Sequence, residues 1–132
     1  MALKLTLKPH EKLIIGGAVI INGSARSDLI IENNVPILRE KGIMSIKDAD
    51  SPCKRIYFAI QLMYVDEKNI TDHHKTYWEL VKDVAEAAPS RKEQLTEISE
   101  HIIAGRYYQA LKITRKLIDY EQEAINNVRN TA

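Results

Sequence analysis

The chain has 132 residues, of which 45% are hydrophobic and 28% are charged, a balance typical of a globular protein and not of a disordered one. Its formal net charge of +1 excludes a strong global attraction to nucleic acid, so any such binding must come from a local patch. No apolar leader with a small-residue cleavage site opens the chain, and the single Cys53 cannot form an internal disulfide, so we expect a cytoplasmic protein.

Residues 1–49 carry the pattern of a small antiparallel sheet or barrel of about five strands. Leucines alternate with Lys4, Thr6 and Lys8, which is the period of two expected for a strand with one buried face. Turn-forming pairs separate three further apolar runs: the runs lie at 12–15, 18–21 and 28–31, and the pairs are Gly16–Gly17, Asn22–Gly23 and Asn33–Asn34. The last run contains Pro36, which cannot donate to a ladder, so this strand should be short and at an edge.

The stretch DSPCKRIYFAIQLMYVD predicts a central helix that is covered on more than one side. Asp50 or Ser51 can cap its start, and Pro52 suits its first position. Nine of the ten residues at 56–65 are apolar, and a helix that is apolar nearly all round must be packed by other elements. We therefore expect residues 50–132 to form a helical subdomain that shares a core with the sheet.

Two further helices follow the central one. The second is predicted to have a cap at Thr71 or Asp72 and to end before Pro89. Its buried face is expected to carry Trp78, Val81, Val84 and Ala85. Ser90 and Glu93 match a capping box for the third helix. The apolar stripe of that helix is predicted at Leu95, Ile98 and Ile102.

Gly105 is a natural stop for the third helix, and a last helix is predicted from Arg106 to about Asn127. Its buried positions are expected to be Tyr107, Leu111, Thr114, Ile118 and Ile125. Because one glycine joins them, the third and fourth helices should form an antiparallel hairpin. The predicted fold class is therefore α+β, with a small antiparallel sheet packed on about four helices.

The common catalytic signatures are missing from the chain. No P-loop, G-x-S-x-G, H-E-x-x-H or paired C-x-x-C occurs, so we expect no enzymatic activity, cofactor or metal. His73 and His74 would point about 100° apart on a helix, which favours surface histidines. Cys53 lies in the first turn of the central helix, where the dipole favours a thiolate, and both a redox role and an inert, partly buried thiol stay open. The central helix, about 21 Å long, is too short to cross a bilayer.

Cations occupy the first turns of two predicted helices. Lys54 and Arg55 face the positive end of the helix dipole at a cost of roughly 0.3 to 1 kcal/mol each, and Arg91 and Lys92 repeat the arrangement. One interpretation is that nearby carboxylates neutralise them, the candidates being Asp48, Asp50 and Glu93. The other is an anion site, in which backbone N–H groups and two cations bind a phosphate or carboxylate.

An aromatic and basic stripe is predicted on the last helix, formed by Tyr108, Lys112, Arg115 and Lys116. Asp119 lies within one turn of the three cations and can pair with Arg115 or Lys116, which favours a solvated, salt-bridged face. The alternative is that this stripe is a protein-interaction surface.

The segment LREKGIM at residues 38–44, followed by SPCKRIYFAIQLMYVD, closely resembles the FlbT family of alphaproteobacterial flagellar regulators. The opening LKLTLKPHEKLIIGGAVIING fits the same family, so the resemblance covers essentially the whole chain. It implies a cytoplasmic post-transcriptional regulator of flagellin synthesis that acts through the untranslated leader of flagellin mRNA, controlling its translation and stability. Most family members are described as repressors, and some relatives behave as activators.

The N-terminal part also resembles the CsrA family of small RNA-binding regulators, whose alternating leucines and final strand correspond to LKLTLKPHE and ILREKGI here. Arg39 matches the arginine of that last strand, which in the CsrA family contacts RNA, and Lys4, Thr6 and Lys8 lie on the matching first strand. The family has two arginines where this chain has Leu7 and Lys8. The resemblance therefore implies a shared fold but not a shared RNA sequence preference.

These observations lead to two hypotheses about partners. In the first, the flagellin mRNA leader is bound by Lys4, Thr6, Lys8, Arg39, Lys54 and Arg55. No aromatic residue precedes Tyr57, so contact on the sheet should rely on hydrogen bonds and phosphates. In the second, the protein is an adaptor without direct RNA contact, and a FlaF-like flagellar protein or flagellin binds the stripe at Tyr108, Lys112, Arg115 and Lys116. A homodimer is expected in either case. The grounds are the apolar central helix, the edge strand with Pro36, and the resemblance to the CsrA family, whose members are dimers.

Overall fold

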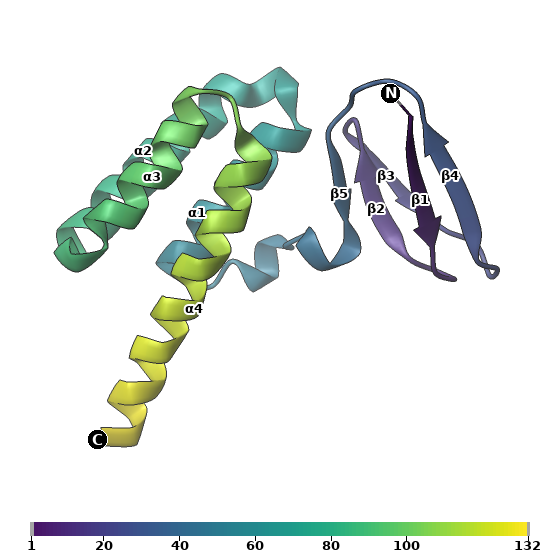
Figure 1. The fold of residues 1–132 in the computed structure, drawn as a ribbon. Coiled ribbons are helices and arrows are strands. Elements are labelled where there is room, and N and C mark those ends of the chain that lie inside the picture. The colour runs from purple at the N-terminus through teal and green to yellow at the C-terminus, as the bar shows by residue number, and fades with distance from the viewer. Residues whose placement is uncertain (1, 132) are drawn as a thin grey trace. The chain divides into compact units, whose positions relative to one another are not determined.

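The computed structural model describes residues 2–131 (Figure 1). Side chains are described through residue 129. The chain divides into two compact units, the first formed by residues 2–43 and 65–67 and the second by 44–64 and 68–131. All strands lie in the first unit and the four α-helices make up most of the second. The α+β class and the number of helices predicted from the sequence are thus confirmed.

Each of the five predicted apolar runs forms a strand. The strands are β1 (Leu3–Leu7), β2 (Lys12–Ile15), β3 (Ala18–Ile21), β4 (Ser27–Ile31) and β5 (Ile37–Arg39). They pair antiparallel in two separate sheets, one of β1 and β4 and the other in the order β3-β2-β5. Over residues 2–131 the ladders therefore do not close into a barrel.

The core of the first unit is built from the alternating leucines of β1 and from Leu13 of β2. Leu5, Leu7 and Leu13 are buried, and half-buried apolar residues pack against them, namely Ile15, Ile20, Leu29, Ile31 and Ile37. Pro36 directly precedes β5, and its carbonyl accepts a hydrogen bond from the Gly16 N–H at 2.8 Å. The expected short edge strand is confirmed, since β5 has three residues and lies at the edge of its sheet.

The turns of the first unit agree only in part with the sequence. Gly16 and Gly17 have φ values of 55° and 89°, as a tight hairpin between β2 and β3 requires. Asn22 and Asn34 were expected to supply positive φ as well, and they do not. Instead, the Asn22 side-chain amide donates to the carbonyls of Lys8 at 2.8 Å and of Ala25 at 3.0 Å, so it binds the loop together through hydrogen bonds.

The second unit contains α1 (Pro52–Val65, whose last residue belongs to the first unit), α2 (Ile70–Ala87), α3 (Lys92–Ile103) and α4 (Tyr107–Thr131). Among the short 3-10 turns, η1 (Glu40–Gly42) belongs to the first unit, whereas η2 (Ile46–Asp48) and η4 (Pro89–Arg91) belong to the second. The turn η3 (Glu67–Asn69) begins in the first unit and ends in the second. Helix α1 starts as predicted, because Pro52 is its first residue and the Ser51 hydroxyl accepts the Lys54 N–H at 3.3 Å.

Helix α1 has one buried polar residue, and the structure explains it. The Gln61 amide donates to the Met44 carbonyl at 2.9 Å and its oxygen accepts the Met44 N–H at 2.7 Å. Ile56 and Ile60 are fully buried beside it. Phe58 and Leu62, however, are only half-buried, so the helix is not covered on every side.

Helix α2 departs from its prediction at the start and on its buried face. It begins at Ile70, and neither Thr71 nor Asp72 is its cap, because both lie inside its first turn. Trp78 was predicted to be buried but is 41% exposed, whereas the neighbouring Tyr77 is fully buried. The Tyr77 hydroxyl lies 2.9 Å from the Ser99 hydroxyl of α3, so the buried ring has a hydrogen-bond partner for its polar end.

Helices α3 and α4 form the expected hairpin. The stripe Leu95, Ile98 and Ile102 is buried, and α3 packs on α4. The capping box is wrong, since Pro89 instead opens η4 and no side chain caps α3. Gly105 has φ of 76°, and the N–H groups of Gly105 and Arg106 donate to the carbonyls of Ile102 and His101, which is a Schellman ending.

Helix α4 is longer than predicted and is buried only in its first half. The buried positions are Ala110, Leu111, Thr114 and Leu117. Ile125 was predicted to be buried, but it is 37% exposed. Beyond Leu117, no described side chain of α4 is buried, so Ile125 lies on a part of the helix that does not enter the core.

Candidate functional site

Arg39, which was predicted to contact RNA, is occupied by contacts inside the first unit. Its guanidinium forms a two-pronged ion pair with the Glu11 carboxylate, with Nη2 at 2.8 Å from Oε2 and Nε at 3.0 Å from the same oxygen. It also donates to the Thr6 carbonyl at 2.8 Å. The Lys8 backbone N–H and the Arg39 guanidinium together hold the pKa of Glu11 below its ordinary value. Arg39 thus joins β5 to β1 across the two sheets.

The polar face of β1 carries the other sheet residues of the predicted RNA site. Asp28 on β4 accepts a hydrogen bond from the Thr6 hydroxyl at 2.9 Å and pairs with the Lys4 ammonium at 3.7 Å. Lys8 is exposed at the end of the strand. The structure therefore brings Lys4 and Thr6 together around a carboxylate, which reduces the positive charge of this face.

The N-terminus of α1 holds an anion, and the anion belongs to the chain itself. One oxygen of the Glu121 carboxylate accepts the Cys53 N–H at 3.0 Å, and the other accepts the Ser51 hydroxyl in a short hydrogen bond. A carboxylate at this position satisfies free N–H groups and complements the helix dipole. The anion site considered from the sequence is therefore filled from α4, and it is not open to a phosphate at this position.

The cations of the two helix starts have different surroundings. Lys54 pairs with Asp50 at 3.2 Å, as the neutralising interpretation predicted. Arg91 lies over the Tyr120 ring, 4.6 Å from its centroid. Arg55 is exposed, and within residues 2–131 its guanidinium has no ion pair or hydrogen bond. Lys54 and Arg55 both belong to the helical unit.

Cys53 lies in an environment that suppresses the thiolate. Burial raises the pKa of the thiol to about 12, and the negative charge of Glu121 acts in the same direction, while Arg91 opposes them. The helix dipole and nearby cations were expected to favour the thiolate, but the Glu121 carboxylate occupies that helix end. Of the two interpretations, the inert buried thiol is the one that this geometry supports.

The predicted stripe on α4 brings the exposed Tyr108 together with cations. We call the surface of Tyr108, Lys112 and Lys116, with the half-buried Tyr64 of α1, the α4 face. The Tyr64 and Tyr108 ring centroids are 6.0 Å apart at an angle of 44°, and Tyr108 is 46% exposed. The Lys112 ammonium lies 5.6 Å from the Tyr108 centroid. An exposed ring beside ammonium groups is suited to stack on a base, while the ammonium groups pair with phosphates.

The expected salt-bridged character of this stripe is not observed. Among the residues that the structure describes, Asp119 forms no ion pair. Arg115 instead covers the buried Tyr57 ring at 4.9 Å from the centroid and donates to its hydroxyl at 3.3 Å. Arg115 therefore anchors α4 to α1, and within residues 2–131 neither Lys112 nor Lys116 forms an ion pair.

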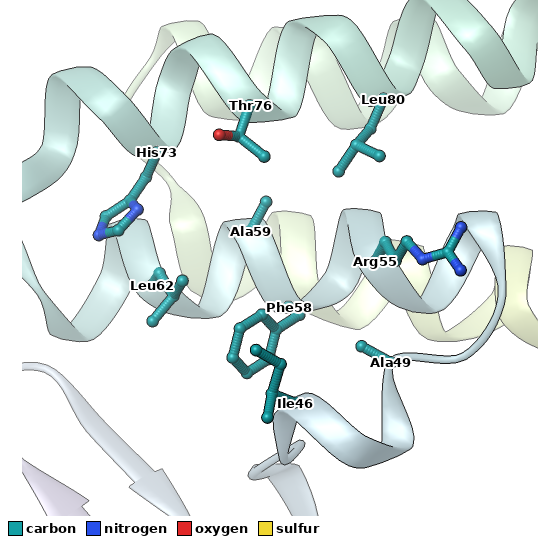
Figure 2. Close-up of a pocket in the computed structure, with 9 residues that line it drawn as sticks. All are labelled: Ile46, Ala49, Arg55, Phe58, Ala59, Leu62, His73, Thr76 and Leu80. Atoms are coloured by element: carbon teal, nitrogen blue, oxygen red, sulfur yellow. The ribbon is translucent and has the colours of Figure 1, made fainter.

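An apolar groove lies on another side of the helical unit, between α1, α2 and η2 (Figure 2). Its volume is about 330 Å³. It is lined by Ile46, Ala49, Arg55, Phe58, Ala59, Leu62, His73, Thr76 and Leu80. Arg55 is the one arginine or lysine among these lining residues.

The Glu121 contact and the apolar groove were not predicted from the sequence. Glu121 could have been noticed, because it lies seven residues after the buried Thr114 and so continues the inward stripe of α4 with a carboxylate. The groove gave no comparable signal, since Phe58 and Leu62 were assigned to the core and Ile46 lies outside any predicted helix. Over residues 2–131, no helix combines the length and the apolar character that a membrane span requires.

The chain is similar to flagellar proteins over most of its length. The family described as "Flagellar protein FlbT" matches residues 3–125. "Probable flagellum biosynthesis repressor protein FlbT 1" of Bradyrhizobium diazoefficiens is 46% identical over 93% of this chain and 84% of the relative. "Flagellum biosynthesis repressor protein FlbT" of Caulobacter vibrioides is 37% identical over 97% of this chain and 92% of the relative. No solved structure matches the chain.

Proposed function

This chain belongs to the FlbT family of flagellar proteins, and on that premise we propose that it represses flagellin synthesis by binding the untranslated leader of flagellin mRNA. The direction of the effect comes from the relatives, which are named flagellum biosynthesis repressors. Because translation takes place in the cytoplasm, the protein acts there. The structure contributes the candidate surface for the RNA.

The observation that carries the proposal is the α4 face. Single-stranded RNA is recognised by rings on which unstacked bases stack and by cations that pair with the phosphates. Tyr108 supplies an exposed ring, and Lys112 and Lys116 supply ammonium groups one and two turns further along the same side of α4. The two lysines repel each other at i, i+4, a small cost of roughly 0.2 to 0.5 kcal/mol that an RNA phosphate would remove.

The sheet is a weaker candidate than the sequence suggested. Arg39 is held by Glu11, and Lys4 and Thr6 share Asp28, so a bound RNA would have to replace these internal contacts. A cation that leaves an ion pair gains less from a phosphate than a free one does. We therefore place the RNA contact on the α4 face.

The test is fluorescence anisotropy of a labelled flagellin leader RNA at several salt concentrations. The double variant Lys112→Ala and Lys116→Ala should bind more weakly, and its salt slope should fall by about 1.4, since each phosphate contact contributes about 0.7 on single strands. Tyr108→Leu should weaken binding by about fivefold or more, because a stacked base contributes about 1 to 3 kcal/mol. A scrambled RNA of equal length controls for sequence preference.

The matched control removes the same charge from the sheet, through Lys4→Ala and Lys8→Ala. This variant should bind the leader normally. If it loses binding while the α4 variant does not, the RNA contact lies on the sheet, as the sequence first indicated. If the unmodified protein does not bind the leader at all, direct RNA binding is wrong and an adaptor role takes its place.

A further inference from the structure

The groove of Figure 2 has two helical walls with matched spacing. Helix α1 contributes Arg55, Phe58 and Leu62 at i, i+3 and i+7. Helix α2 contributes side chains at the same spacing, namely His73, Thr76 and Leu80. This periodicity produces two ridges with a trough between them, which is the shape that accepts a third helix.

The groove leaves apolar surface in contact with water. Ile46 on η2 forms its third wall and is 76% exposed, which is high for an isoleucine that lines a depression. Phe58 and Leu62 are only half-buried, although they lie on the most apolar helix of the chain. The exposed side chain of Ile46 and the half-buried Phe58 and Leu62 are thus available to apolar side chains of a ligand.

The lining selects a helix and not an extended peptide. An extended segment needs partners for its own backbone N–H and C=O groups, usually an open strand edge. The groove contains no strand, and its Thr76 hydroxyl already donates to the Asp72 carbonyl at 3.1 Å. A helix satisfies its backbone internally and needs only apolar contacts from the groove.

The charge at one end of the groove identifies the polar part of the ligand. Arg55 is exposed at the lining, and within the described chain its guanidinium has no internal ion pair. The nearby Asp50 is taken by Lys54 at 3.2 Å. The site thus complements a negative charge next to an apolar surface. A mostly apolar lining with a single arginine does not suit RNA, which carries a phosphate at every nucleotide.

We propose that this groove binds an amphipathic helix of a partner protein, with apolar residues at i, i+3, i+4 and i+7 in the trough and a carboxylate paired with Arg55. This site is separate from the α4 face, and its occupation does not depend on RNA binding.

The test uses a fluorescein-labelled synthetic helix with leucines at i, i+3, i+4 and i+7 and one glutamate, and a second peptide with lysine in place of the glutamate. Titrated with the full-length protein, the glutamate peptide should bind at least about tenfold more tightly than the lysine peptide. Arg55→Glu should reverse this preference, which a general loss of structure would not do.

The chain offers a matched pair of variants for the apolar wall. Ile46 and Ile103 are each 76% exposed, but only Ile46 lines the groove. Ile46→Glu should reduce the binding of the glutamate peptide by at least about tenfold, whereas Ile103→Glu should leave it unchanged, with equal melting temperatures for both variants.

Three results would overturn the proposal. The first is equal binding by the two isoleucine variants or no peptide binding at all. The second is a dimer that Ile46→Glu dissociates, which would assign the groove to a second copy of the chain. The third is an apolar small molecule that native mass spectrometry finds bound in the unmodified protein and absent from Ile46→Glu. None of these results bears on leader RNA binding by the α4 face.

Discussion

The contact of Glu121 with the start of α1 provides the sharpest test of how the helical unit is held together. Glu121→Ala removes the acceptor for the Cys53 N–H and the Ser51 hydroxyl, both of which are partly buried. A hydrogen bond to a charged group contributes about 1.5 to 3 kcal/mol, and loss of a helix cap costs about 0.5 to 2 kcal/mol. Since both effects act at one site they do not add fully, and we expect the free energy of unfolding to fall by about 2 to 4 kcal/mol.

Urea unfolding followed by circular dichroism measures this change. With a slope of about 2 kcal/mol per molar urea, the midpoint should fall by about 1 to 2 M while the slope stays constant. Glu121→Gln keeps one acceptor oxygen but removes the charge, so its midpoint should lie between those of the alanine variant and the unmodified protein.

The control is Glu123→Ala, which removes an exposed carboxylate two residues further along α4. This change should alter the free energy of unfolding by no more than about 0.5 kcal/mol. If Glu121→Ala and Glu123→Ala have the same urea midpoint, the Glu121 carboxylate does not stabilise the start of α1.

Four further predictions follow from the core, the ion pair, the thiol and the assembly. Ile60 is fully buried, so Ile60→Ala should lower the free energy of unfolding by about 2 to 5 kcal/mol in a thermal or urea melt; a change typical of a surface site would show that α1 is not central. Because the folded state lowers the pKa of Glu11, its carboxylate stabilises the fold above about pH 4.3 and this stability is lost as the pH falls through the folded pKa. The difference in urea midpoint between the unmodified protein and Glu11→Gln should accordingly shrink toward acid pH, and a difference independent of pH would contradict it. Cys53, with its pKa raised to about 12, should resist iodoacetamide at pH 8 in the native protein and react once unfolded, whereas rapid native alkylation would contradict its burial. The homodimer expected from the sequence stays a prediction, and sedimentation equilibrium at micromolar concentration showing only a 15.1 kDa species would remove it.

Local sequence patterns were enough to predict the strands and helices of this protein. The alternation around Leu5 and Leu7, the pair Gly16–Gly17 and the stop at Gly105 depend on backbone sterics and on side-chain period, which act over a few residues. A local pattern gave a wrong prediction at the start of α3, where the sequence fits both a capping box and a proline-initiated turn. The motif at Ser90 matched a capping box, but Pro89 next to it opened a 3-10 turn instead.

The tertiary structure alone decided how distant side chains are used. Cys53 and Glu121 are 68 residues apart, and Arg39 and Glu11 are 28 residues apart, so no local pattern connects either pair. Their contacts arise because burial of the apolar stripes brings the polar groups beside them into one place, where each must find a partner. For this reason the cations predicted to bind RNA have different roles in the structure. Arg39 forms an internal ion pair with Glu11, whereas Arg55 lines the groove.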